Sequence, residues 1–130
     1  MILTLKIAQE FLNDPYGVRS YGVRLEDYTS MDNAAAEELA QHKGTLWLLS
    51  LTSLSDAAAQ ALAQHKGGLE LRGLTKLSDK AAQALGKHEG WLWLCGLTKL
   101  SDKAAQALAK HKGNLDLNGK AEEAVKLARE

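Results

Sequence analysis

The chain repeats itself every 23 residues, and this period constrains the fold more than any single residue does. The copy that begins at Leu74, LTKLSDKAAQALGKHEGWLWLCG, differs at only five positions from the copy that begins at Leu97. Two earlier copies begin at Tyr28 and Leu51, so four copies run without a gap from Tyr28 to Gly119. A fixed period of about 20 to 50 residues is typical of folds built from stacked repeats.

Each copy contains one strand-like and one helix-like segment. Residues 69–71 alternate apolar with polar, which predicts a short strand with its leucines facing inward. Residues 56–66 are rich in alanine, follow the capping candidate Ser55 and stop at Gly67, which predicts a helix. A strand and a helix of this size cannot bury their own apolar faces, so the copies must stack. We therefore expect an α/β fold with one parallel sheet of five strands, the first of them at residues 23–25.

The two ends depart from the repeat, as expected of segments that cover the exposed ends of a stack. Residues 1–27 predict an N-terminal cap that contains a helix, followed by the first strand. Residues 120–130 carry apolar side chains on one face and predict a closing helix. We expect a single domain over residues 1–130, with the four repeats at residues 28–119 between the two caps.

The leucine spacing LxLxxLxxL, seen at Leu69, Leu71, Leu74 and Leu77, resembles a leucine-rich repeat of the short bacterial type. The resemblance covers residues 28–119. It implies a curved solenoid with the sheet on its concave side, helices on its convex side, and protein recognition on the concave face. It implies no catalytic chemistry.

One position departs from the usual leucine-rich pattern, because leucine stands where an asparagine or cysteine is common. The residues at this position are Leu51, Leu74 and Leu97. A threonine follows each of them, and Thr29 occupies the same place in the first copy. We expect these threonine hydroxyls to supply hydrogen bonds in place of the asparagine side chain.

Composition narrows the classes of function. Sixteen basic residues balance sixteen acidic ones, so no net positive charge draws the chain to nucleic acid. Cys95 is the only cysteine, and the first residues lack the pattern of a secretory signal, so we expect a reduced, cytoplasmic protein. No apolar run approaches the roughly 18 residues that a membrane span needs.

The positions that vary while the repeat framework stays constant point to a binding surface. Three of the five differences between the last two copies lie at residues 91, 93 and 95, which are outward-facing strand positions. All three tryptophans occupy such positions, and aromatic residues and arginine are enriched in binding hot spots. The predicted protein-binding residues are Trp47, Leu49, Glu70, Arg72, Trp91, Trp93 and Asp116.

The spacing of two tryptophans suggests how a partner would be held. Trp47 and Trp93 flank the strand that carries Arg72, so their strands are about 10 Å apart. This spacing predicts a slot between the rings for a guest side chain, or a place for Arg72 against one ring. The alternative is that the indoles pack on each other and merely shield the sheet.

We expect a non-catalytic module that binds a protein or peptide on this face. The alternative is a structural solenoid that forms a homodimer through the same face, and a small-molecule or carbohydrate site ranks below both. No phosphate-binding loop, nucleophile motif or metal-ligand spacing occurs, so we expect no enzyme activity, cofactor or metal. Glu70 and Asp116 are expected to be exposed, and Cys95 to have no base beside it.

Four histidines recur at one repeat position, which raises the question of a metal site. They are His42, His65, His88 and His111. A column with one imidazole per repeat does not provide ligands that converge from different directions. We therefore expect rings that point inward near the helix ends, contact backbone carbonyls and make the fold sensitive to acid.

Overall fold

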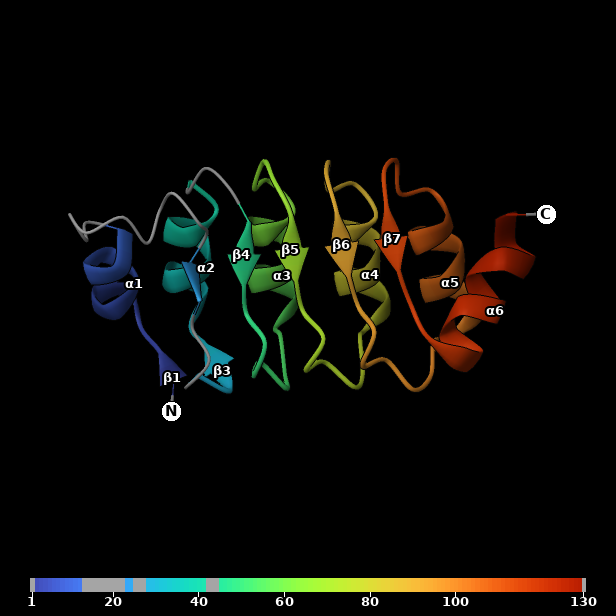
Figure 1. Cartoon of the computed structure of the whole chain (residues 1–130), viewed down its shortest axis with the longest axis horizontal. Helices are drawn as coiled ribbons and strands as arrows, with labels where there is room; N and C mark the ends of the chain where they lie inside the picture. Colours follow the sequence, from blue (N-terminus) through green and yellow to red (C-terminus); the bar gives the residue numbers. More distant parts are fainter. Residues whose placement is uncertain (1, 13–22, 25–27, 42–44, 130) are drawn as a thin grey trace.

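The computed structural model describes residues 2–12, 23–24, 28–41 and 45–129. Within these residues short strands alternate with helices, and the pairs lie in a row along the long axis of the molecule (Figure 1). The strands are β1 (Ile2–Leu3), β2 (Val23–Arg24), β3 (Ser30–Met31), β4 (Leu46–Trp47), β5 (Leu69–Glu70), β6 (Leu92–Trp93) and β7 (Leu115–Asp116). The helices are α1 (Leu5–Leu12), α2 (Asn33–Leu39), α3 (Asp56–Leu62), α4 (Asp79–Leu85), α5 (Asp102–Ala109) and α6 (Gly119–Arg129).

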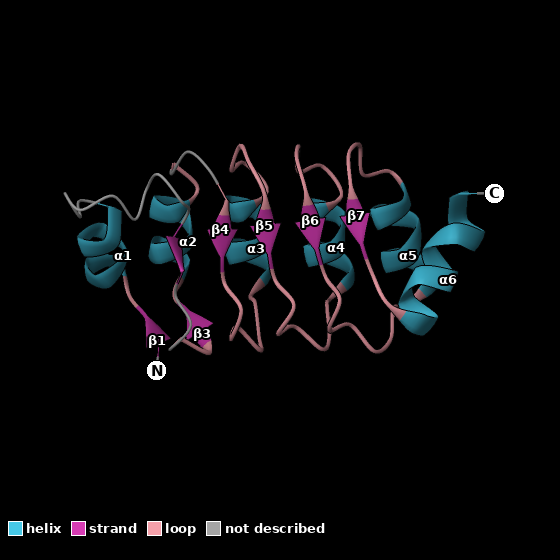
Figure 2. Ribbon diagram, in the orientation of Figure 1, coloured by secondary structure: helices cyan, strands magenta, loops and turns pink. Residues whose placement is uncertain are grey.

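A parallel sheet of five strands, in the order β2-β4-β5-β6-β7, runs through the repeats. Neighbouring strands pair with an offset of one repeat, so that Leu46 is opposite Leu69 and Leu69 is opposite Leu92. Each helix packs against the next helix in the chain. Figure 2 shows the strands in front and the helices behind them, so the sheet has one covered face and one open face.

The N-terminal region contains a second, two-stranded sheet that the repeat pattern did not predict. In it β1 pairs in parallel with β3, and Leu3 is opposite Met31. The α1 helix packs against α2. The repeat pattern missed this sheet because β1 lies in the N-terminal segment, which departs from the 23-residue repeat.

The helices begin where the capping residues predict but end earlier. Ser55 accepts a hydrogen bond from the backbone N–H of Ala58, as an N-cap residue does. The predicted end of this helix at residue 66 was wrong, because α3 ends at Leu62. Gly67 then adopts a φ of 131°, which lets the chain turn toward β5. The described part of the chain contains no helix that is both long and apolar enough to cross a bilayer.

The core lies between the sheet and the helices and consists mainly of leucine and alanine. The strand leucines Leu46, Leu69 and Leu92 are fully buried. The predicted threonine contacts are present between two pairs of repeats. The hydroxyl of Thr52 donates to the carbonyl of Thr29 at 3.4 Å, and Thr98 donates to Thr75 at 3.3 Å. These contacts link successive turns at the position where leucine replaces the usual asparagine.

Candidate binding surface on the open face of the sheet

Trp47 and Trp93 pack against each other on the open face. Their ring centroids lie 6.0 Å apart and their planes meet at 71°, an edge-to-face arrangement. The predicted slot between these rings was therefore wrong. The strands that carry them are separated by β5, but each indole is long enough to reach over that strand. The alternative arrangement, in which the indoles pack together and shield the sheet, is the one observed.

Glu70 lies on β5 between these two tryptophans and is only 1% exposed. The expectation that this carboxylate is exposed was wrong, because the indoles on both neighbouring strands cover it. One carboxylate oxygen accepts a hydrogen bond from the backbone N–H of Arg72, and the other lies 3.1 Å from the Arg72 guanidinium. The hydrogen bond and the charge of Glu70 raise the pKa of Arg72. Arg72 is thus held by Glu70 and is exposed at its outer surface.

Trp91 remains open to solvent, with 48% of its surface exposed. Its ring lies 5.3 Å from that of Trp93. Trp47, Trp93 and Trp91 therefore form one continuous aromatic surface, which we term the tryptophan cluster. Its Trp91 end is the part that a partner can reach, because Trp47 and Trp93 are half-buried.

The remaining predicted residues lie around this cluster with different exposures. Asp116 is exposed on β7 and pairs in register with Trp93. Leu49 and Cys95 are half-buried. Burial raises the pKa of the Cys95 thiol, and the carboxylates of Asp116 and Glu70 raise it further. The thiol therefore carries little of the thiolate character that a nucleophile needs.

The histidine column is buried between the helix ends and the sheet, as predicted for three of its four members. His65 and His88 are 1% exposed and His111 is 5% exposed, whereas His42 lies outside the described residues. Neighbouring rings are stacked, with centroids 6.2 Å and 6.0 Å apart. Burial lowers the pKa of His88 and of His111 below the ordinary value of 6.5. Protonation of the stack is therefore unfavourable in the folded chain.

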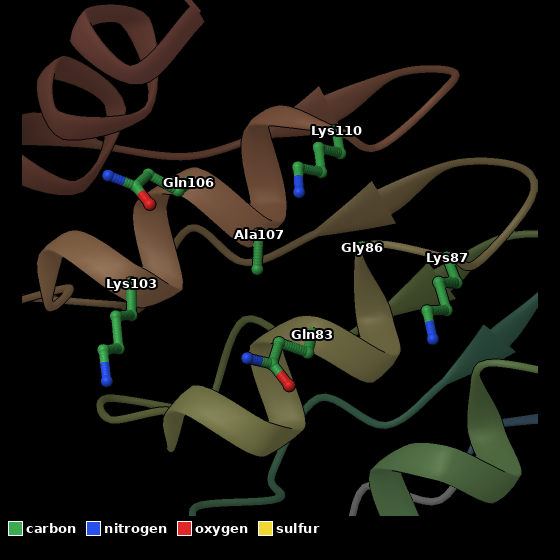
Figure 3. A pocket seen from close by; sticks show the side chains of 7 residues that line it. All are labelled: Gln83, Gly86, Lys87, Lys103, Gln106, Ala107 and Lys110. Carbon is green, nitrogen blue, oxygen red and sulfur yellow. The ribbon is translucent and has the colours of Figure 1, made fainter.

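Sequence reasoning missed a set of grooves on the opposite, helical side. Figure 3 shows the groove between α4 and α5, which has a volume of about 340 Å³. Gly86 and Ala107 line it together with three lysines and two glutamines, namely Lys87, Lys103, Lys110, Gln83 and Gln106. The signal in the sequence that could have found this surface is the recurrence of lysine at the same positions of the last two repeats.

Among the described residues, no three histidine, cysteine, aspartate or glutamate side chains are arranged to hold a metal ion. The chain matches no protein-family profile, no curated protein and no solved structure.

Proposed function

We propose that this chain is a leucine-rich repeat solenoid that binds a protein or peptide on its concave sheet face through the tryptophan cluster. The repeat architecture is supported by the strand register, which advances by one copy from each strand to the next. Helices that contact their nearest neighbours in the chain support it as well. The leucine spacing supports the family likeness.

The observation that carries the binding proposal is the exposed ring of Trp91 at the end of an otherwise packed aromatic cluster. Trp47 and Trp93 hold each other in place, so Trp91 rests on a rigid aromatic support. A large aromatic side chain that is already ordered loses little conformational entropy on binding. Arg72, fixed by Glu70, adds a positive group near the aromatic surface. We therefore expect a partner that offers an apolar side chain next to a hydrogen-bond acceptor.

We propose that this binding is not accompanied by catalysis. The raised pKa of Cys95 works against a thiolate nucleophile at neutral pH. Glu70 is engaged by Arg72 beneath the tryptophans, which removes it as an acid or base for a ligand. Asp116 is exposed, so its surroundings do not provide the desolvated pocket that most catalytic carboxylates use.

The test uses Trp91→Asn, because Asn114 occupies the equivalent position in the next repeat and the substitution suits the backbone. Peptides are selected from a phage-displayed random library on the full chain and then titrated by fluorescence anisotropy. The matched control is Leu127→Gln, which removes an apolar side chain that is 69% exposed on α6. We expect W91N to weaken peptide binding by about tenfold or more, the usual loss at a hot spot, and L127Q to leave it unchanged. Peptides that bind W91N as tightly as the unaltered chain would refute the proposal.

The alternative function is self-association through the same face, and sedimentation velocity over a concentration series distinguishes it. A chain that is monomeric throughout supports a partner of a different kind. A dimer that W91N converts to monomer, and that L127Q leaves intact, would instead assign the tryptophan cluster to a homodimer interface. In that case any peptide whose binding depends on Trp91 would have to compete with dimer formation.

A further inference from the structure

Charge is distributed unevenly along this chain although its net charge is zero. The first 65 residues contain four basic and eight acidic residues, whereas the last 65 contain twelve basic and eight acidic residues. Three positions account for most of the difference. They are serine, alanine and glutamine in the first two repeats and lysine in both later repeats. The six lysines are Lys76, Lys80, Lys87, Lys99, Lys103 and Lys110.

The fold places four of these lysines, Lys80, Lys87, Lys103 and Lys110, on the helical side, where successive helix pairs form similar grooves of different charge. The groove between α2 and α3 is lined by Glu37 and glutamines, with no lysine among its described residues. The groove between α3 and α4 contains Lys80 and Lys87. The groove between α4 and α5 contains Lys87, Lys103 and Lys110. The positive charge therefore increases from one repeat to the next along a single surface.

The ammonium groups of this surface are available to a ligand. All six lysines are exposed, and among the described residues none of them forms an ion pair. Besides Asp116 on β7, the acidic residues of the same two repeats are Asp79, Asp102 and Glu89. Asp79 already accepts a hydrogen bond from the N-cap hydroxyl of Ser101. In the view of Figure 3, Gln83 lies between Lys103 and Lys87, so an amide that can both donate and accept separates two cations.

We propose that the surface formed by α4 and α5 binds an acidic polypeptide segment, with glutamate or aspartate side chains over the lysines and its backbone on Gln83 and Gln106. Charge complementarity supports an anionic partner. The described lining of the α4/α5 groove contains no arginine, the residue that forms bidentate pairs with phosphates. It also contains no aromatic ring on which a nucleic-acid base could stack. It also lacks large apolar side chains that would insert into a lipid surface. Lysine and glutamine together suit carboxylates joined by a peptide backbone.

The experiment titrates the full chain against a fluorescein-labelled deca-glutamate peptide. The groove variant K87Q/K103A/K110Q replaces each lysine by the residue that the first two repeats carry at that position, so we expect it to fold. The control variant K6Q/K66Q/K126Q removes the same charge from exposed lysines that do not line the described grooves. We expect the groove variant to lose about tenfold or more in affinity and the control to lose less than about threefold. Raising salt from about 0.05 M to 0.5 M is expected to weaken binding, because it shortens the screening length.

Equal losses in the two variants would overturn the proposal, since the attraction would then depend on net charge alone. Tighter binding to a single-stranded oligonucleotide of equal charge, or to vesicles containing phosphatidylserine, would overturn the choice of a polypeptide. A salt-sensitive increase in sedimentation coefficient without peptide would assign the surface to a second copy of the chain. Each outcome is independent of Trp91, which lies on the opposite side of the sheet.

Discussion

Trp93 separates two acidic side chains on the open face. The register places Glu70 opposite it on β5 and Asp116 opposite it on β7. An aspartate at this position, as in the next repeat, would place three carboxylates side by side on neighbouring strands, whereas the uncharged Trp93 avoids that repulsion. This single residue therefore affects stability as well as the shape of the aromatic surface, and Trp91 is the better position at which to test binding alone.

The substitution Trp93→Asp copies the residue of the next repeat but is expected to destabilise this one. It removes a large aromatic contact with Trp47 and puts a carboxylate beside Glu70, at a cost of about 2 to 4 kcal/mol. Urea unfolding of W93D, E70Q and the double variant measures the coupling between the two carboxylates. We expect the double variant to be more stable by about 1 kcal/mol than the sum of the single effects predicts. Strict additivity would show that the repulsion is absent.

Gly96 is required by a close approach between neighbouring repeats. A Cβ atom at this position would clash with the backbone carbonyl oxygen of Arg72, so the backbone would have to shift to accommodate it. We expect Gly96→Ala to cost about 3 kcal/mol of unfolding free energy. The control is Gly68→Ala, whose Cβ would meet the side chain of Thr45 at 3.2 Å and the Cβ of Trp91 at 3.6 Å, with no backbone atom as near. We expect it to cost less than about 1 kcal/mol. Equal unfolding midpoints for the two variants would contradict the close approach.

At the scale of the helices, the N-caps connect one repeat with the one before it. Ser78 accepts a hydrogen bond from the backbone N–H of Ala81 and donates its hydroxyl proton to Asp56, at the start of the preceding helix. Ser101 does the same with Asp79, and Ser55 does so with Asn33. Each serine therefore begins its own helix and sets the position of that helix beside its neighbour.

Replacing Ser78 with alanine removes both contacts, and we expect it to cost about 1 kcal/mol, the typical loss for an N-cap. Ser53→Ala provides the control, because Ser53 is exposed and lies outside the caps. The two variants are compared by urea unfolding monitored by circular dichroism. A cost for S78A no larger than that for S53A would show that this cap contributes nothing to stability.

At the scale of the whole molecule, the histidine stack runs through successive repeats like the sheet and the row of helices. His65, His88 and His111 lie against one another in sequence, so a proton on one of them affects the next. The charge of Glu89 raises the pKa of His88 and so opposes part of the lowering that burial causes. The charge of Arg129 on α6 lowers the pKa of His111 further. The last imidazole of the stack therefore interacts electrostatically with the C-terminal helix through Arg129.

We expect the chain to lose stability as the pH falls through the range in which free histidine titrates. The folded pKa values of His88 and His111 lie below the unfolded value of 6.5, so the unfolded chain binds more protons near and below that pH. The melting temperature should be constant above about pH 7 and should decrease below about pH 6.5, before most carboxylates titrate. Thermal denaturation between about pH 7.5 and 5.5 measures this, and a constant melting temperature there would contradict the prediction.

The variant His88→Gln separates this effect from other acid-sensitive groups. It removes the middle imidazole and keeps a side chain that can form hydrogen bonds with the backbone. Whatever its melting temperature at neutral pH, its decrease on acidification should be smaller than that of the unaltered chain. A decrease of the same size would assign the acid sensitivity to groups outside the stack.

The sequence was most informative where the repeat itself carries the signal. The period predicted the strand and helix of each copy, the inward leucines and the serine N-caps, because each of these depends on residues close together in the chain. The inward direction of the histidines also followed from the helix pattern. The helix ends were less predictable, since the connection to the next strand begins before the alanine-rich segment ends.

What the sequence by itself determined is the alternation of strand and helix and the stacking of one copy on the next, because a 23-residue unit has no other way to bury its leucines. Only the tertiary structure decided how side chains pack across strands that are not adjacent. Whether Trp47 and Trp93 leave a slot or meet over Glu70 depends on the reach and packing of two indoles, and no local pattern specifies this. The lysines of separate repeats likewise become one surface only after the helices are placed side by side.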